Sequence, residues 1–247
     1  MKRVHLIITR QDKPDAAPYV QEFLVPHSDN MNVVTALMEI QKNPVTREGV
    51  TVNPVVWECN CLEEVCGACS MLINGRARQA CSALIAHLQQ PVRLAPLSKF
   101  PVVRDLIVDR QRMFDALKTV KGWVTVDGTM PLGRGPRMAQ TAQEEVYPLS
   151  RCMTCGCCME SCPNYHAGSA FLGPAPIAQV QLFNSHPIGA MQKDERLDAL
   201  AGSGGIAACG NAQNCAAACP KQIPLTGAIA KLNRQVNLFT FRKLFDK

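Results

Sequence analysis

The sequence has few aromatic residues, no long apolar run and no evident leader segment. Phenylalanine, tyrosine and tryptophan make up only 5% of the 247 residues. Proteins that bind single-stranded nucleic acids stack bases on aromatic side chains set among basic ones, so this composition disfavours that class. No stretch approaches the ~20 apolar residues of a membrane span. Residues 1–10 predict no signal peptide, because their apolar run is short and is broken by His5 and Arg10.

Cysteine, in contrast, is abundant, with 13 residues in the chain. A disulfide framework is one explanation, but it is typical of short secreted chains with an even number of cysteines. The odd number and the chain length favour metal centres in a reducing compartment instead. The formal net charge of +6 then needs no anionic partner. Each cluster held by four thiolates is itself an anion of about −2 and offsets part of this charge.

The first cysteine group has the spacing of a plant-type [2Fe–2S] site. Cys61, Cys66 and Cys69 are arranged as C-x4-C-x2-C, and Cys81 follows as the fourth ligand. A zinc ribbon is the alternative, but it uses paired C-x2-C knuckles, and only Cys66 and Cys69 form one here. Cys59 falls outside the pattern and is predicted to be a small buried or idle thiol.

The second group has the spacing C-x2-C-x2-C-x3-C-P of a bacterial two-cluster ferredoxin. Its members are Cys152, Cys155, Cys158, Cys162 and Pro163. In such a run the first three cysteines hold one cluster and the fourth holds the other. Cys157 lies off this pattern. It is an alternative to its neighbour Cys158, but the spacing argues against the exchange.

The third group ends at Cys219 and lacks one cysteine of the same run. The ferredoxin spacing would place a cysteine at position 212, which is Ala212. A cubane with three protein ligands lacks the iron at its empty corner, so a [3Fe–4S] cluster is predicted. Its ligands would be Cys162, Cys209 and Cys215. The [4Fe–4S] ligands would be Cys152, Cys155, Cys158 and Cys219. The alternative is a [4Fe–4S] cluster with a non-cysteine fourth ligand.

Hydrophobic periodicity predicts a β-rich first part and a helical second part. The first part would hold a hairpin from residues 3–9 and 19–25, a helix over 32–41 capped by Asn30 or Asn32, and strands over 70–73, 79–83 and 92–97. The Asn74-Gly75 pair predicts a tight turn. A helix is predicted over 102–121. Further helices are predicted over 149–161, 177–183, 194–201, 206–218 and 225–236.

The motif from Cys61 to Met71, followed by Ile73-Asn74-Gly75 and Ala80-Cys81, resembles the iron–sulfur subunit of succinate dehydrogenases and fumarate reductases. Residues 101–109 resemble that family's interdomain helix, and the two C-terminal cysteine runs also match, so the resemblance covers nearly the whole chain. It implies an α+β fold. A β-grasp plant-type ferredoxin domain would span 1–104, and an α-helical bacterial-type ferredoxin domain would span 105–247.

The resemblance also implies a role in electron transfer. A flavoprotein subunit would oxidise succinate at its FAD, and electrons would pass singly through [2Fe–2S], [4Fe–4S] and [3Fe–4S] to a quinone at an integral membrane anchor. The chain would have no catalytic residue of its own and no nucleic-acid partner. It would lie peripherally on the cytoplasmic face of a bacterial cell membrane, as part of a complex. The alternatives are quinol-driven fumarate reduction and a zinc-stabilised interaction module without a redox role.

Two departures from the family pattern bear on the quinone. Many ubiquinone-reducing relatives carry tryptophans just after the Cys-Pro pair and a histidine after the second [3Fe–4S] cysteine. This chain has Asn164-Tyr165-His166 and Gly210 there. The resemblance therefore indicates menaquinone-linked bacterial members, which often have anchors with haem b. Tyr165 and His166 are candidates for contact with a proximal quinone or a haem edge, and interface packing is the alternative.

Overall fold

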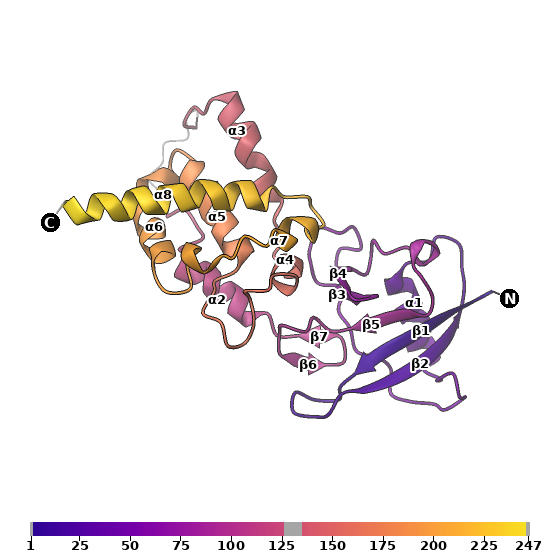
Figure 1. Ribbon diagram of the computed structural model, residues 1–247. Helices are drawn as coiled ribbons and strands as arrows, with labels where there is room; N and C mark the ends of the chain where they lie inside the picture. The colour runs from indigo at the N-terminus through magenta and orange to yellow at the C-terminus, as the bar shows by residue number, and fades with distance from the viewer. Residues whose placement is uncertain (1, 126–134, 246–247) are drawn as a thin grey trace. The chain divides into compact units, whose positions relative to one another are not determined.

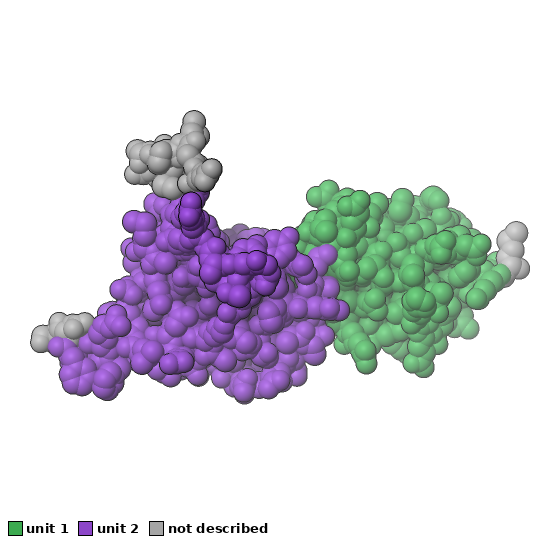
Figure 2. Space-filling view, turned by 90° about the horizontal axis from the view of Figure 1, so that it is seen from above, with its two compact units in different colours: residues 1–110, 153–160 green, residues 111–152, 161–247 purple. Residues whose placement is uncertain are grey.

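The computed structural model describes residues 2–125 and 135–245 (Figure 1). The chain divides into two compact units. Unit 1 comprises residues 1–110 and 153–160, and unit 2 comprises residues 111–152 and 161–247 (Figure 2). Unit 1 therefore includes a short segment from the second cysteine group.

Unit 1 is built on a mixed five-stranded sheet with the order β2-β1-β5-β3-β4. The strands are β1 (Arg3–Arg10), β2 (Tyr19–Pro26), β3 (Ser70–Ile73), β4 (Arg76–Gln79) and β5 (Val92–Ala95). β1 and β5 run parallel, and the other neighbours are antiparallel. With the helix α1 (Val33–Lys42) and the one-turn η1 (Ile85–His87), this is the expected β-grasp domain.

The core of unit 1 follows from the alternation of apolar residues in its strands and from their helical spacing in α1. Val4, Leu6 and Ile8 alternate along β1 and are completely buried. Helix α1 begins after Asn32, whose Oδ1 accepts a hydrogen bond from the backbone N–H of Thr35 at 2.9 Å. The predicted hairpin, helix and N-cap are thus confirmed.

The predicted strand over 79–83 is wrong, and β4 begins and ends earlier. Asn74 and Gly75 have φ of +49° and +78°, which suits a two-residue hairpin turn. Such a turn forces pairing to start at once, with Ile73 opposite Arg76, and the register ends with Ser70 opposite Gln79.

The predicted helix over 102–121 is wrong in its first half. A small hairpin of β6 (Val102–Arg104) and β7 (Ile107–Val108) precedes helix α2 (Gln111–Thr119). Asp105 between the two strands has φ +46° and is completely buried. Its carboxylate accepts hydrogen bonds from Arg10 Nε at 3.1 Å, from Arg10 Nη2 at 2.8 Å and from the backbone N–H of Val56 at 2.9 Å. These long-range partners fix a turn where local periodicity favours a helix.

Most of the helices lie in unit 2. They are α2, α3 (Gln140–Val146), α5 (Pro174–Ser185), α6 (Lys193–Ala201), α7 (Asn214–Ala217) and α8 (Leu225–Phe245), with one-turn segments η2 (Tyr147–Arg151), η3 (Gly189–Gln192) and η4 (Ile206–Ala208). Helix α8 packs against α5 and α6 (Figure 1). Every helix in the described part of the chain is too short or too polar to cross a membrane.

The predicted helices over 177–183, 194–201 and 225–236 are confirmed, and α8 runs further than expected. Those over 149–161 and 206–218 are wrong, because each is broken by a cysteine loop. In the first, only η2 and the one-turn α4 (Cys157–Glu160) are helical, and Thr154 and Gly156 between them have φ of +48° and +87°. In the second, Asn211 and Gln213 have φ of +53° and +62°.

Candidate iron–sulfur cluster sites

The loop from Cys61 to Cys69 turns its backbone N–H groups toward its own sulfurs. Left-handed conformations at Leu62 (φ +61°), Glu64 (φ +57°) and Gly67 (φ +74°) wind the chain tightly. Because only glycine adopts this region without strain, two strained residues in one loop mark a conformation held for a function.

Three of these N–H groups donate to thiol sulfurs. Those of Glu63 and Val65 lie 3.4 Å from Cys61 Sγ, and that of Ala68 lies 3.5 Å from Cys66 Sγ. The two donors to Cys61 lower the pKa of its thiol to about 7. The loop therefore favours a negatively charged sulfur, which is the form that binds iron.

The other two cysteines of the group lie where the β3–β4 hairpin meets this loop. The backbone N–H of Ala80 donates to the carbonyl oxygen of Cys69 at 3.1 Å, and Cys81 follows directly. Both thiols are buried. Burial, followed by the contact with Cys69, raises the pKa of Cys81 to about 11. Metal-free Cys81 is thus a neutral thiol, and iron must displace its proton.

This donor set fits a [2Fe–2S] cluster. Four thiols from one loop and one strand end are available, and the loop supplies N–H donors to thiolate sulfurs. Cys59 is exposed, so the expectation of a buried thiol was wrong, although an idle role remains predicted. Among the described residues, no three histidine, cysteine or acidic side chains form a group that could hold a single metal ion.

The predicted [4Fe–4S] ligands come from both units. Cys155 and Cys158 lie in the segment 153–160 of unit 1 and are 9% and 8% exposed, whereas Cys152 and Cys219 belong to unit 2. The pKa of the Cys155 thiol is lowered to about 7, first by a hydrogen bond from the side chain of Cys157. The same contact raises the pKa of Cys157, which therefore stays protonated.

Glu160 attaches this segment to the β-rich part of unit 1. The carboxylate is 8% exposed. It accepts from the backbone N–H of Ser98 at 3.0 Å, from Ser98 Oγ at 2.5 Å, and from the backbone N–H of Lys99 at 3.0 Å. Three donors to one buried carboxylate hold the Cys155–Cys158 turn in place.

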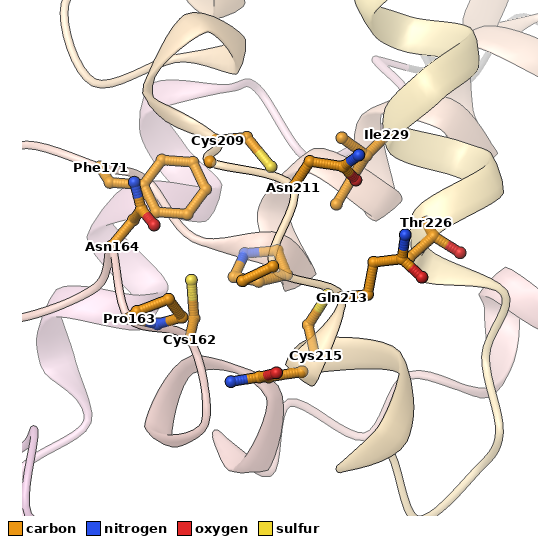
Figure 3. A pocket seen from close by; sticks show the side chains of 14 residues that line it. Cys162, Pro163, Asn164, Phe171, Cys209, Asn211, Gln213, Cys215, Thr226 and Ile229 are labelled. Atoms are coloured by element: carbon orange, nitrogen blue, oxygen red, sulfur yellow. The ribbon is translucent and has the colours of Figure 1, made fainter.

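The third group lines a cavity in unit 2. It encloses about 370 Å³ free of protein atoms, part of it open to solvent. Figure 3 shows the sulfur atoms of Cys162, Cys209 and Cys215 turned toward this space. Ala212, where the ferredoxin run would have a cysteine, lines the same cavity without a metal-binding group. Three thiols, with no fourth among the described residues that line the cavity, fit a [3Fe–4S] cluster.

Two asparagines hold the walls of this cavity together. Asn164 Nδ2 donates to the carbonyl oxygen of Ala208 at 2.9 Å. Asn214 Nδ2 donates to the carbonyl oxygen of Ser161 at 3.2 Å. Each bond joins the segment around Cys162 to the segment that carries Cys209 and Cys215.

The two predicted quinone or haem contacts differ in exposure. Tyr165 is completely buried, with the Arg112 guanidinium 4.3 Å from its ring centre. The same Arg112 donates to the carbonyl oxygen of His166 at 2.7 Å and to that of Ser169. The His166 side chain is exposed.

Sequence reasoning missed three polar residues beside the ligands of unit 1, namely Gln79, Arg110 and Glu160. Arg110 Nη1 donates to the carbonyl oxygen of Gly67 at 2.8 Å. Gln79 Nε2 lies 3.5 Å from Cys157 Sγ. Their partners are 43 and 78 positions away in the chain, so no local motif marks them.

Comparison with known proteins identifies one family for each of two parts of the chain. The family described as "2Fe-2S iron-sulfur cluster binding domain" matches residues 5–115, and the family described as "4Fe-4S dicluster domain" matches residues 148–223. A chain of the Sdh1 complex of Mycobacterium smegmatis in its apo form has the same fold, with a TM-score of 0.81 over 95% of each chain at 22% identity.

Two curated relatives match over nearly their whole length. The fumarate reductase iron-sulfur subunit of Mycobacterium tuberculosis is 31% identical over 249 residues, which cover 99% of this chain and 97% of that protein. The succinate dehydrogenase iron-sulfur subunit of Bacillus subtilis is 59% identical over 244 residues, covering 99% and 96%. The chain belongs to the family of iron–sulfur subunits of succinate dehydrogenase and fumarate reductase.

Proposed function

We propose that this chain carries single electrons between the FAD of a flavoprotein subunit and a quinone at a membrane anchor. Each cluster, when bound, accepts and releases one electron. The [2Fe–2S] ligands are Cys61, Cys66, Cys69 and Cys81. The [4Fe–4S] ligands are Cys152, Cys155, Cys158 and Cys219. The [3Fe–4S] ligands are Cys162, Cys209 and Cys215.

The cavity of unit 2 is the observation that carries the proposal. Three cysteine sulfurs face it (Figure 3). Ala212, which occupies the position of the missing cysteine in the ferredoxin spacing, lines the same cavity. The protein contributes the thiolates, the surrounding apolar wall from Phe171 and Ile229, and the asparagine bonds that fix the loops. The role of these residues is to hold a cluster still, so that little reorganisation accompanies electron transfer.

The direction, partners and location are inferred from relatives. Succinate oxidation is favoured, because the Bacillus subtilis relative at 59% identity is a succinate dehydrogenase subunit, whereas the fumarate reductase relative is at 31%. The partners would be an FAD-containing subunit and an integral membrane anchor with haem b, on the cytoplasmic face of the cell membrane. Gly210 and the Asn164-Tyr165-His166 segment support menaquinone. The opposite direction, fumarate reduction, is the second candidate.

The roles that we assign to Tyr165 and His166 follow from the exposure of their side chains. We assign interior packing to Tyr165, because it is completely buried, and contact with a quinone or a haem edge to the exposed His166. We propose that residues 1–104 form a functional domain that carries [2Fe–2S], and that residues 105–247 form a second domain that carries the other two clusters.

Co-purification and turnover test this function. The chain is co-expressed with its flavoprotein and anchor partners, membranes are isolated, and succinate is added anaerobically. We expect the assembled complex in the membrane fraction, with FAD in the flavoprotein subunit and iron in this chain. Succinate should reduce a menaquinone analogue, and this activity should be lost in Cys209→Ser. A purified chain that holds zinc instead of iron, or a complex that reduces no quinone with succinate, would contradict the proposal.

A further inference from the structure

The side chain of Gln79 lies between two sulfur atoms of unit 1. It is the last residue of β4, is completely buried, and pairs with Ser70 across the hairpin. Its Oε1 accepts from the Cys69 thiol at 3.6 Å, and its Nε2 donates to Cys157 Sγ at 3.5 Å. A buried amide therefore connects a cysteine of the first group with a cysteine of the second.

Cluster binding changes what each sulfur offers to this amide. Cys69 as an iron ligand is a thiolate, which only accepts hydrogen bonds. Cys157 lies outside the ligand sets and keeps its S–H, which can rotate from Cys155 to the amide oxygen of Gln79. A half-turn of the Gln79 amide exchanges its nitrogen and oxygen and satisfies both sulfurs. Ser70 Oγ accommodates this turn, because it lies 3.0 Å from Nε2 and 3.2 Å from Oε1 and donates its own proton to the carbonyl oxygen of Gly67 at 2.6 Å.

We propose that Gln79 is a positioning residue that donates an N–H to the ligand sulfur of Cys69 and accepts the S–H of Cys157. An added electron increases the negative charge on the ligand sulfurs, and an N–H donor stabilises that charge. Gln79 thereby raises the reduction potential of [2Fe–2S]. It also ties the Cys69 ligand to the turn that carries Cys155 and Cys158. The inference rests on the ligand sets proposed above.

Redox titration of the assembled complex, followed by EPR, tests this role. Gln79→Leu keeps the size of the side chain and removes both hydrogen-bonding groups. We expect the equilibrium constant for reducing [2Fe–2S] to fall about tenfold, which is about 59 mV for one electron. The [4Fe–4S] potential should move less and the [3Fe–4S] potential should stay unchanged. Gln89→Leu is the matched control, because it makes the same change at an exposed glutamine, and it should move no potential.

An unchanged [2Fe–2S] potential in Gln79→Leu, at full cluster occupancy, would overturn the inference. If that variant does not assemble, Cys157→Ala probes the bridge from its other end, since it removes the S–H that orients the amide. The [2Fe–2S] potential should again fall, and an unchanged value would overturn the inference. Failure of the ligand assignment itself is distinguishable, because the unmodified complex would then lack the [2Fe–2S] signal.

Discussion

A Cβ atom at Gly67 would lie only 2.8 Å from the Cα atom of Cys155. Gly67 stands between two predicted [2Fe–2S] ligands, Cys66 and Cys69, and Cys155 is a predicted [4Fe–4S] ligand. The two cysteine loops of unit 1 therefore meet backbone to backbone, with no side chain between them. Because electron transfer weakens steeply with distance, this contact suits the hand-over of an electron from one loop to the other.

Gly67→Ala should separate these loops. The new methyl group would clash with the Cys155 backbone and, at φ +74°, would also strain its own residue. We expect a loss of about 3 kcal/mol or more in unfolding free energy. In a chain of this size that corresponds to roughly 6–12 °C in the thermal midpoint. The [2Fe–2S] EPR signal should also weaken.

Gly49→Ala is the matched control for strain alone. Gly49 has φ +85°, but a methyl group added to it would meet no atom within 4 Å. Gly49→Ala should lower the free energy of unfolding by only about 1–2 kcal/mol and leave the EPR signals intact. An equal loss of unfolding free energy in the two variants would show that the contact between Gly67 and Cys155 adds nothing to stability.

Glu160→Gln should loosen the segment that carries Cys155 and Cys158. The neutral amide offers a weaker acceptor to the three donors from Ser98 and Lys99, and its NH₂ group faces one of them. We expect the free energy of unfolding to fall by about 1–3 kcal/mol, measured by thermal unfolding. The occupancy of the [4Fe–4S] site, measured by iron content, should also fall. Glu144→Gln, at an exposed position on α3, should change neither quantity.

Much of the fold and the ligand pattern could be predicted from the sequence, because both depend on short spacings. The Asn32 cap, the alternation along β1 and the Asn74-Gly75 turn are local signals, and the structure confirms each of them. The cysteine spacings likewise bring Cys162, Cys209 and Cys215 to one cavity.

Several of the failures depend on a partner that is distant in sequence. The turn at Asp105 depends on Arg10, 95 positions earlier, so local periodicity wrongly predicted a helix. Gln79 and Glu160 carry no motif, since each acts on a segment more than 60 positions away. Backbone conformations with positive φ, as at Gln213, broke the predicted helices around the cysteines.

Ala212→Cys should convert the centre in unit 2 from [3Fe–4S] to [4Fe–4S]. The new thiol would line the cavity at the position of the missing ligand. Iron analysis should show one additional iron atom per chain, and the EPR signal of the oxidised [3Fe–4S] cluster should disappear. Ala217→Cys adds a cysteine at an exposed position outside the cavity lining and should change neither readout. An unaltered signal in Ala212→Cys would argue against the assigned ligand set.

Substitution by serine should affect the [2Fe–2S] cluster at Cys61 but not at Cys59. Cys61 Sγ accepts two backbone N–H groups, whereas the Cys59 side chain is exposed and lies outside the spacing. Cys59→Ser should leave the [2Fe–2S] EPR spectrum and the iron content as they are. Cys61→Ser should abolish the cluster or shift its spectrum. A spectral change in Cys59→Ser would reassign the first ligand.

We propose that the cysteines assigned above bind three clusters, one of them [3Fe–4S]. EPR of the anaerobically purified complex, oxidised and then reduced stepwise with iron quantified, tests it most directly. We expect a near-isotropic signal in the oxidised sample that vanishes on mild reduction, followed by signals from reduced [2Fe–2S] and [4Fe–4S]. Absence of the oxidised signal, with iron enough for two cubanes, would contradict the role assigned to Ala212 and require a non-cysteine fourth ligand.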